Sequence, residues 1–214
     1  MAPERTPVDV VDGRRARRDR SRAAVIDAVF ALIQHGKVPP SAEDVAECSG
    51  VSVSSIFRMF DGLDDMRQAA FERYEHDYAH LVATEFTDDP TRLDRIDRLV
   101  RARLELYEAT ASVLRFARQR ALDHESNAAR VGLQRTRLAD QVQRCLSDET
   151  RQLTPVAAAN LVAAVDALTA PEAFDVLSAA HGRTSRQIGA IWRRSLAALV
   201  ADWCDGVPDE GVST

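Results

Sequence analysis

Residues 41–66, with the sequence SAEDVAECSGVSVSSIFRMFDGLDDM, constrain the fold more than any other part of the chain. Ser41 is expected to cap a first short helix, and Asp44 stands three residues later, where a capping-box partner belongs. Gly50 falls where the chain must turn sharply, because glycine adopts a positive φ at little cost. The spacing therefore predicts two short helices joined by a tight turn.

The second of these helices is expected to begin at Ser52, a second capping residue. Ile56 and Phe60 are spaced i and i+4, so they face the interior together. The residues predicted to face outward are Val53, Ser54, Phe57 and Arg58. Small hydroxyl residues at the start of a helix allow close approach to a DNA major groove, with hydrogen bonds to phosphates or base edges. The alternative is a helical hairpin without any role in nucleic-acid binding.

The same segment resembles the DNA-binding pattern of the tetracycline-repressor (TetR) family, T-x-x-D-I-A-x-x-A-G-V-S-x-G-T-[LIF]-Y-x-[HY]-F-x-[SN]-K-E-[DE]-L. The matching positions are Ser41, Asp44, Val45, Ala46, Gly50, Val51, Ser52, Ser55, Ile56, Phe57, Phe60, Asp64, Asp65 and Met66. The sequence departs from the pattern at Val53, where lysine is common, and at Ser54, which replaces glycine. Phe57 lacks the tyrosine hydroxyl that usually reaches a phosphate, and Leu63 replaces a lysine.

The resemblance implies an all-α protein with an N-terminal three-helix helix-turn-helix DNA-binding head and a helical ligand-binding and dimerisation body, about nine helices in total. The expected divisions are a flexible arm (1–14), a DNA-binding domain (15–62, with its motif at 41–60), the body (63–205) and a flexible tail (206–214). Beyond the motif, periodicity and capping signals predict helices over residues 15–35, 62–85, 92–108, 110–121, 125–146, 155–168, 170–177 and 184–204, with a break at 147–154.

The function implied by the resemblance is that of a transcriptional regulator, predicted to be a repressor. It would bind a palindromic operator in double-stranded DNA as a homodimer and be released by a small-molecule effector. The residues expected at the DNA are Arg22, Ser41, Ser52, Ser54, Ser55, Phe57 and Arg58. The alternative function is a helical ligand-binding or scaffold protein that has this fold without specific DNA binding.

The charge distribution agrees with a DNA-binding head, although the whole chain carries a net charge of -5. Residues 14–37 contain seven basic and two acidic residues. In the resembling family the start of the first helix lies over the DNA backbone. Arginines there would supply salt-dependent, sequence-independent affinity. The alternative for Arg14 and Arg15 is a solvated, frayed helix end.

Two further sets of residues are predicted on the body. The helix over 184–204 carries an apolar stripe, and in the resembling family this helix and the preceding long one form a four-helix bundle with their two-fold mates. The predicted dimer interface is Ile188, Ile191, Trp192, Leu196, Leu199, Val200 and Trp203. The ligand-pocket candidates, which rest on the resemblance alone, are Tyr78, Phe86, Tyr107, Phe116, His124 and Cys145.

Other functional classes find little support in the sequence. No nucleophile stands in a recognisable turn and no glycine-rich loop is present, so no enzyme activity and no cofactor are expected. His76 and His80 share a helix face with Glu72, but we predict solvated side chains rather than a metal site, since no third ligand position is evident. No segment is apolar enough for a signal peptide or a membrane span, which predicts a cytoplasmic protein without a membrane partner.

Overall fold

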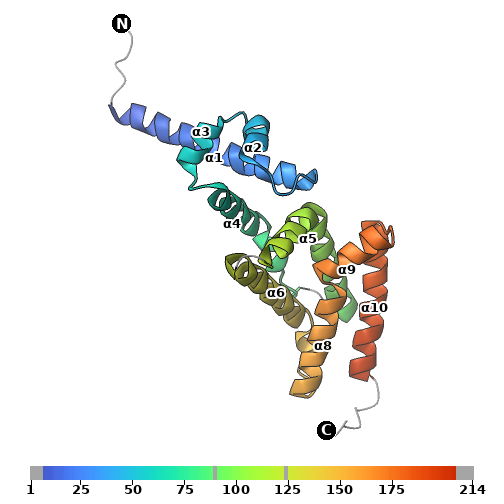
Figure 1. The fold of residues 1–214 in the computed structure, drawn as a ribbon. Helices are drawn as coiled ribbons and strands as arrows, with labels where there is room; N and C mark the ends of the chain where they lie inside the picture. Colours follow the sequence, from blue (N-terminus) through green and yellow to red (C-terminus); the bar gives the residue numbers. More distant parts are fainter. Residues whose placement is uncertain (1–6, 89–90, 123–124, 206–214) are drawn as a thin grey trace. The chain divides into compact units, whose positions relative to one another are not determined.

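The structure is a computed structural model that describes residues 7–88, 91–122 and 125–205. Every regular element in these ranges is a helix, which confirms the predicted all-α class (Figure 1). The elements are α1 (Pro7–Gln34), α2 (Ala42–Ser49), α3 (Val53–Met59), α4 (Leu63–Val82), α5 (Arg92–Ala121), α6 (Glu125–Cys145), α7 (Ser147–Thr150), α8 (Pro155–Leu168), α9 (Pro171–Asp175), the π-helical segment η1 (Val176–Ala180) and α10 (Ser185–Asp205).

The chain divides into two compact units, one up to Asp77 and one from Tyr78 onward. The division lies within α4, whereas the predicted boundary of the DNA-binding domain precedes that helix. Periodicity alone does not reveal where a continuous helix changes its packing partners.

The first unit is built around the C-terminal half of α1. This half packs against α2 and α3, and its buried side chains recur every three or four residues, as expected for one face of a helix. The core residues of the unit are Val25, Ile26, Ala28, Val29, Ile33, Ala42, Val45, Ile56, Phe60, Met66, Ala69, Ala70 and Tyr74. Together they fix α3 with one face inward and the other toward solvent.

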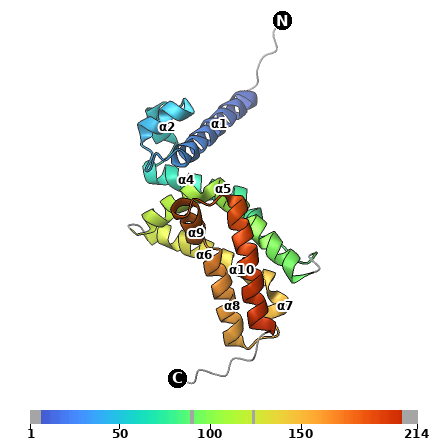
Figure 2. The same cartoon turned by 90° about the vertical axis from the view of Figure 1, so that its right-hand side faces the viewer.

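The second unit is centred on α5, which packs against α6 on one side and α10 on another. Arg95 of α5 donates to the carbonyl oxygen of Cys145, and Arg103 donates to that of Leu138. These contacts run in opposite directions along the two helices, so α5 and α6 are antiparallel. Figure 2 shows α8 and α10 side by side, with α9 joining them at one end.

Several predicted helix ends differ from the structure. Helix α1 begins at Pro7, well before the predicted start at Arg15, because proline suits the first turn of a helix and nothing up to Arg15 stops the helix. The segments predicted as two helices over 92–121 form the single helix α5. Thr110, near the expected break, donates its hydroxyl to the carbonyl oxygen of Leu106 and stays in the helix. The predicted break at 147–154 contains the short helix α7.

The capping signals were more reliable than the breaks. Thr184 and Gln187 form the predicted capping box before α10: the Thr184 amide donates to Gln187 Oε1 at 2.9 Å, and the Gln187 amide donates to Thr184 Oγ1 at 3.3 Å. None of the helices in the described ranges combines the length and the hydrophobicity that a membrane span requires.

Candidate nucleic-acid interface

The start of α2 has the predicted capping box. The amide of Asp44 donates to Ser41 Oγ at 3.1 Å, and the amide of Ser41 donates to Asp44 Oδ2 at 3.2 Å. Lys37 also forms a short ion pair with Asp44. Hydrogen bonds from Lys37 and then from Ser41 lower the pKa of Asp44 to about 2. The Ser41 hydroxyl is thus already engaged in holding the start of α2.

The turn between the two helices depends on Gly50, whose φ of 69° lies in the left-handed region. Its amide donates to the carbonyl oxygen of Ala46 at 3.0 Å and so closes α2. A side chain at this position would be strained by the backbone conformation. Gly50 therefore sets the angle between α2 and α3, as the sequence predicted.

Helix α3 begins with a network of hydroxyl groups. Ser52 Oγ accepts a hydrogen bond from the amide of Ser55 at 3.3 Å, which confirms the predicted N-cap. The Ser52 hydroxyl also donates to Ser55 Oγ at 2.9 Å and lies 3.3 Å from Ser54 Oγ. Arg58 Nη2 donates to Ser55 Oγ at 2.8 Å, so the guanidinium is oriented along the exposed surface of the helix.

The two faces of α3 are clearly separated. Ile56 is 1% exposed and Phe60, which follows the helix, is 2% exposed. Ser54, Phe57 and Arg58 are exposed, and Phe57 presents half of its side chain to solvent. An exposed apolar ring beside hydroxyl and guanidinium donors fits base edges and thymine methyl groups as well as phosphates.

Arg22 does not belong to this exposed face. Its Nη1 donates to the carbonyl oxygen of Met59 at 2.8 Å, and its guanidinium lies 4.2 Å from the centre of the Phe60 ring. The side chain is therefore engaged at the C-terminal end of α3. Arg22 is predicted to position the DNA. In the structure its side chain contacts the protein itself and holds the helix that carries the exposed face.

The ligand-pocket candidates do not gather at one place in the second unit. Tyr107 is fully buried, donates to the carbonyl oxygen of Thr169 at 2.9 Å and accepts from Arg103 Nη1 at 2.9 Å. Burial raises the pKa of its hydroxyl. Its ring packs 5.5 Å from Phe174 and 6.2 Å from Trp192, measured between centroids, so it is a core residue.

Cys145, at the end of α6, lies at a different height along the α5–α6 pair from Tyr107. It is buried where Arg95 meets α6, and Tyr107 is twelve residues beyond Arg95, a rise of about 18 Å along α5. Phe116 is further along α5, Phe86 is buried in the segment after α4, and Tyr78 is partly exposed on α4. The sixth candidate, His124, lies outside the described residues.

Four residues of the predicted dimer interface are buried within the single chain. Ile188, Trp192, Leu196 and Val200 are at most 2% exposed within the single chain, because this stripe of α10 packs against α5 and α8. Ile191, Leu199 and Trp203 retain exposed surface. Periodicity located the apolar stripe correctly, but a stripe covered by the same chain and one covered by a partner have the same spacing.

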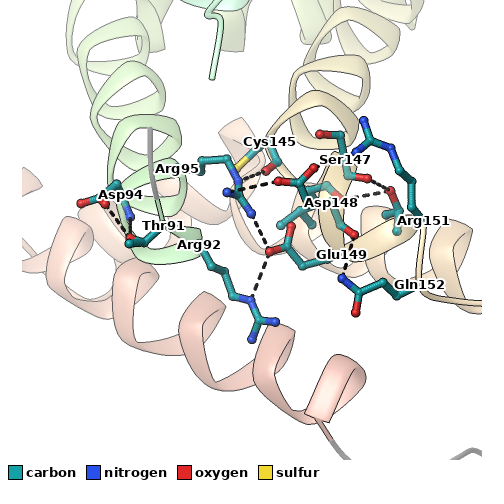
Figure 3. Close-up of polar contacts among 12 residues, drawn as sticks. Thr91, Arg92, Asp94, Arg95, Cys145, Ser147, Asp148, Glu149, Arg151 and Gln152 are labelled. Carbon is teal, nitrogen blue, oxygen red and sulfur yellow. Dashed lines mark hydrogen bonds and ion pairs between the residues drawn. The ribbon is translucent and has the colours of Figure 1, made fainter. Parts of the chain in front are cut away.

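Sequence reasoning missed two buried arginines in the body. Arg95 donates from Nη2 to Glu149 Oε1 at 2.6 Å, and both residues are buried; Arg92 bonds to the same oxygen at 3.2 Å (Figure 3). Arg103 is completely buried and reaches Asp166 Oδ1 at 3.2 Å. Their burial could have been inferred from the sequence, since both arginines lie at i, i+4 spacing within the apolar stripe of α5.

His76 and His80 are both exposed on α4, and His76 lies beside Asp77 at 3.3 Å. Among the described residues, no group of three or more His, Cys, Asp and Glu side chains has an arrangement that could hold a metal ion.

Comparison with known proteins gives a likeness of structure. No protein-family model matches the sequence, and no curated protein matches it. Among solved structures, the chain is similar to a candidate TetR-family transcriptional regulator from Rhodococcus sp., with 18% identity, a TM-score of 0.58, and coverage of 84% of this chain and 98% of that one. It is also similar to a transcriptional regulator from Rhodococcus sp. Rha1, with 20% identity, a TM-score of 0.61, and coverage of 89% and 99%.

Both similarities extend over most of each chain, so they are not confined to the helix-turn-helix. The resemblance first noticed in residues 41–66 thus has a counterpart in the structure as a whole. The chain has the fold of the TetR-family transcriptional regulators.

Proposed function

We propose that this protein is a transcriptional regulator, a repressor, that reads a palindromic DNA operator as a homodimer and is released by a small-molecule effector. The observation that carries the proposal is the outward face of α3. Ser54, Phe57 and Arg58 are exposed on a helix whose opposite face is anchored by Ile56. A short helix held in this way fits into a major groove with its outward side chains at the base edges.

Within that face, Arg58 is the residue expected to read a base. Its guanidinium is exposed and oriented by Ser55, and arginine makes bidentate hydrogen bonds to guanine. Ser54 and Phe57 are assigned to neighbouring phosphates and base edges. Ser41, Ser52 and Ser55 set the helix ends from which these contacts are made, and Arg22 holds α3 from the inside.

The dimer is proposed to form through the outward faces of α8 and α10. On α8, Val156, Ala159, Ala163 and Ala167 are exposed at helical spacing, and Val156 is 71% exposed. On α10, Ile191 is exposed, and Leu199 and Trp203 are partly exposed. Small residues allow two helices to approach closely, and an apolar face of this kind is favourably covered by its two-fold mate.

Release by an effector requires the body to act on α4. The last carbonyl groups of α4 are held from α6: Gln141 Nε2 donates to Leu81 O at 2.6 Å, and Arg144 Nη2 donates to Val82 O at 2.8 Å. An effector bound among the body helices that displaces α6 would therefore pull on the end of α4. Coupling of this kind is typically on the order of 1 to 3 kcal/mol, which changes DNA affinity by several-fold to about a hundredfold.

The test is selection of bound duplexes from a random pool by the purified chain, followed by affinity measurement on the enriched and a scrambled duplex at several salt concentrations. A regulator is expected to enrich a two-fold symmetric sequence whose half-sites are separated by about one helical turn. Enrichment of no sequence, together with affinity that does not fall as salt increases, would favour the alternative of a helical binding or scaffold protein without a DNA target.

A further inference from the structure

The outward face of α3 consists of an apolar strip beside a polar one. Val53 and Phe57 stand four residues apart, so they are neighbours on the helix surface, and we name them the apolar strip. Ser54 and Arg58 have the same spacing one position further along the chain. Phe57 is 50% exposed and Val53 is partly exposed. Hydrocarbon and hydrogen-bonding groups therefore reach the surface side by side.

The apolar strip lies at two positions where the sequence departs from the TetR pattern. Lysine is common at the position of Val53, and Phe57 lacks the tyrosine hydroxyl that usually reaches a phosphate. Phosphate oxygens accept hydrogen bonds, and neither of these side chains can donate one. The strip therefore does not supply the phosphate contacts that the pattern implies, and its partner must offer an apolar group.

The size of the strip limits what this partner can be. A stable protein interface covers about 800 Å² on each partner, which is far more than two side chains provide. Exposed donors border the strip at Ser54 and Arg58, and Ile56 anchors the opposite face of the helix in the core. The strip suits one small apolar group that lies among hydrogen-bonding groups on the surface of the partner.

The major groove of duplex DNA contains such a group. Thymine carries a C5-methyl group there, beside the hydrogen-bonding atoms of the base edges, and phenylalanine is among the side chains that contact this methyl. Unmodified cytosine and uracil lack it. The methyl group distinguishes thymine at a position where the hydrogen bonds of Ser54 and Arg58 do not reach.

We propose that Phe57, with Val53 beside it, contacts the C5-methyl group of a thymine close to the guanine that Arg58 is expected to bind. This inference rests on the proposed function and deepens it, because it assigns the identity of one base to the apolar strip. The contact replaces the phosphate contact that the TetR pattern implies at Phe57. Recognition by this chain thus depends on a methyl group as well as on hydrogen bonds.

The experiment replaces the thymines of the selected operator by uracil, one symmetry-related pair at a time. This removes the methyl group and leaves base pairing intact. One such pair should weaken binding of the unchanged chain by about fifteenfold, because burial of one methyl group is worth about fourfold in affinity and the operator has two half-sites. Competition between the thymine and uracil operators at constant salt measures the ratio.

Phe57→Ala should bind the thymine operator more weakly and should no longer distinguish it from the uracil operator. Phe57→Tyr keeps the ring and should keep the distinction. Leu133→Ala is the matched control, since Leu133 is 49% exposed on α6, and it should behave as the unchanged chain with both operators. Thermal unfolding midpoints should be unchanged in all three variants, because neither residue belongs to the core.

Three results would overturn the inference. The first is a selected operator whose half-sites contain no thymine, or one that tolerates uracil at every thymine. The second is a uracil effect that stays at full size in Phe57→Ala, since another residue would then contact the methyl group. The third is an equal loss of affinity of Phe57→Ala for the operator and for a scrambled duplex, because such a loss indicates a backbone contact.

The failure of this inference differs from the failure of the proposed function. If the chain enriches a two-fold symmetric sequence but tolerates uracil at every position, only the inference is wrong. If it enriches no sequence, thymine and uracil versions of one random duplex are compared instead. A preference for thymine that depends on Phe57 would then support the inference and refute the regulator, whereas equal affinity would refute both.

Discussion

Arg22 of α1 donates a hydrogen bond from Nη1 to the carbonyl oxygen of Met59, the last residue of α3, at 2.8 Å. The guanidinium lies over the ring of Phe60 at the same time. The carbonyl groups at the end of a helix lack partners within it, and a positive charge there is favourable. One side chain of α1 therefore holds the C-terminal end of α3.

Replacement of Arg22 by Leu should reduce the free energy of unfolding by about 1 to 3 kcal/mol, because it removes a charge-assisted hydrogen bond and a cation–π contact. Urea unfolding followed by circular dichroism measures the change. Arg20→Leu is the control, since Arg20 is exposed on the same helix and its loss should alter stability by no more than about 0.5 kcal/mol. Equal losses in the two variants would show that the Arg22 contacts contribute nothing.

Arg58→Ala should weaken binding to the selected operator by about 1 to 3 kcal/mol and reduce the preference at one base pair, because it removes the proposed base contact. Competition between the operator and single-base variants measures both effects. Arg151→Ala removes an exposed arginine of the second unit and should leave affinity unchanged. Unaltered operator affinity in the Arg58 variant would remove this residue from the reading face.

Ser52→Ala should destabilise the first unit by about 1 kcal/mol, whereas Ser52→Gly should cost only a few tenths. Both substitutions remove the capping oxygen, but glycine adopts the N-cap conformation readily and leaves the free amides of the helix end open to water. Hydrogen exchange of the Ser55 amide, which donates to Ser52 Oγ, reports the cap directly. Identical exchange in the alanine variant and the unchanged chain would contradict the capping role.

Asp44 should titrate well below an ordinary aspartate, since its pKa is lowered to about 2 by Lys37 and Ser41. A lowered pKa in the folded state means that the charged carboxylate stabilises the fold. This contribution is complete above 3.8, the ordinary pKa of an aspartate, and is lost as the pH falls toward 2. The carboxyl chemical shift of Asp44 gives the midpoint. Lys37→Gln should move that midpoint upward, and a midpoint that stays near 2 would show that Ser41 alone is responsible.

Ala163→Glu should convert the proposed dimer into a monomer, because it places a charge in the centre of the outward face of α8. Sedimentation velocity measures the change in mass. Leu133→Glu, at a residue of α6 that is 49% exposed, introduces the same charge away from this face and should leave the dimer intact. A chain that is already monomeric before substitution would refute the proposed dimer itself.

The local parts of the fold could be predicted from the sequence because their causes are local. The caps at Ser41, Ser52 and Thr184 and the turn at Gly50 each depend on residues within four positions. The continuity of α5 could not be predicted in the same way. Polar residues such as Glu108 and Thr110 weaken the periodic signal, but the buried contacts on either side keep the helix intact.

The candidate site shows the same distinction. The outward positions of Ser54, Phe57 and Arg58 follow from helical spacing, so the sequence was sufficient. The roles of Arg22 and Trp192 depend on which helix lies opposite. Arg22 meets Met59 across 37 residues of chain, and Trp192 meets Tyr107 of another helix. Pattern alone does not contain such pairings, so it did not show that four residues of the predicted interface are buried within the same chain.

The buried pair of Arg95 and Glu149 restricts how this body can diverge among descendants of the chain. Loss of either partner alone removes the shortest ion pair of a buried charge, at a cost of up to about 3 to 5 kcal/mol, a large share of the stability of a typical domain. Exchange of both for apolar residues of similar volume is often neutral. Arg92 donates to the same carboxylate, so exchange of both residues would also remove a hydrogen-bond partner of Arg92. Homologues are therefore expected to keep these positions together or to lose them together.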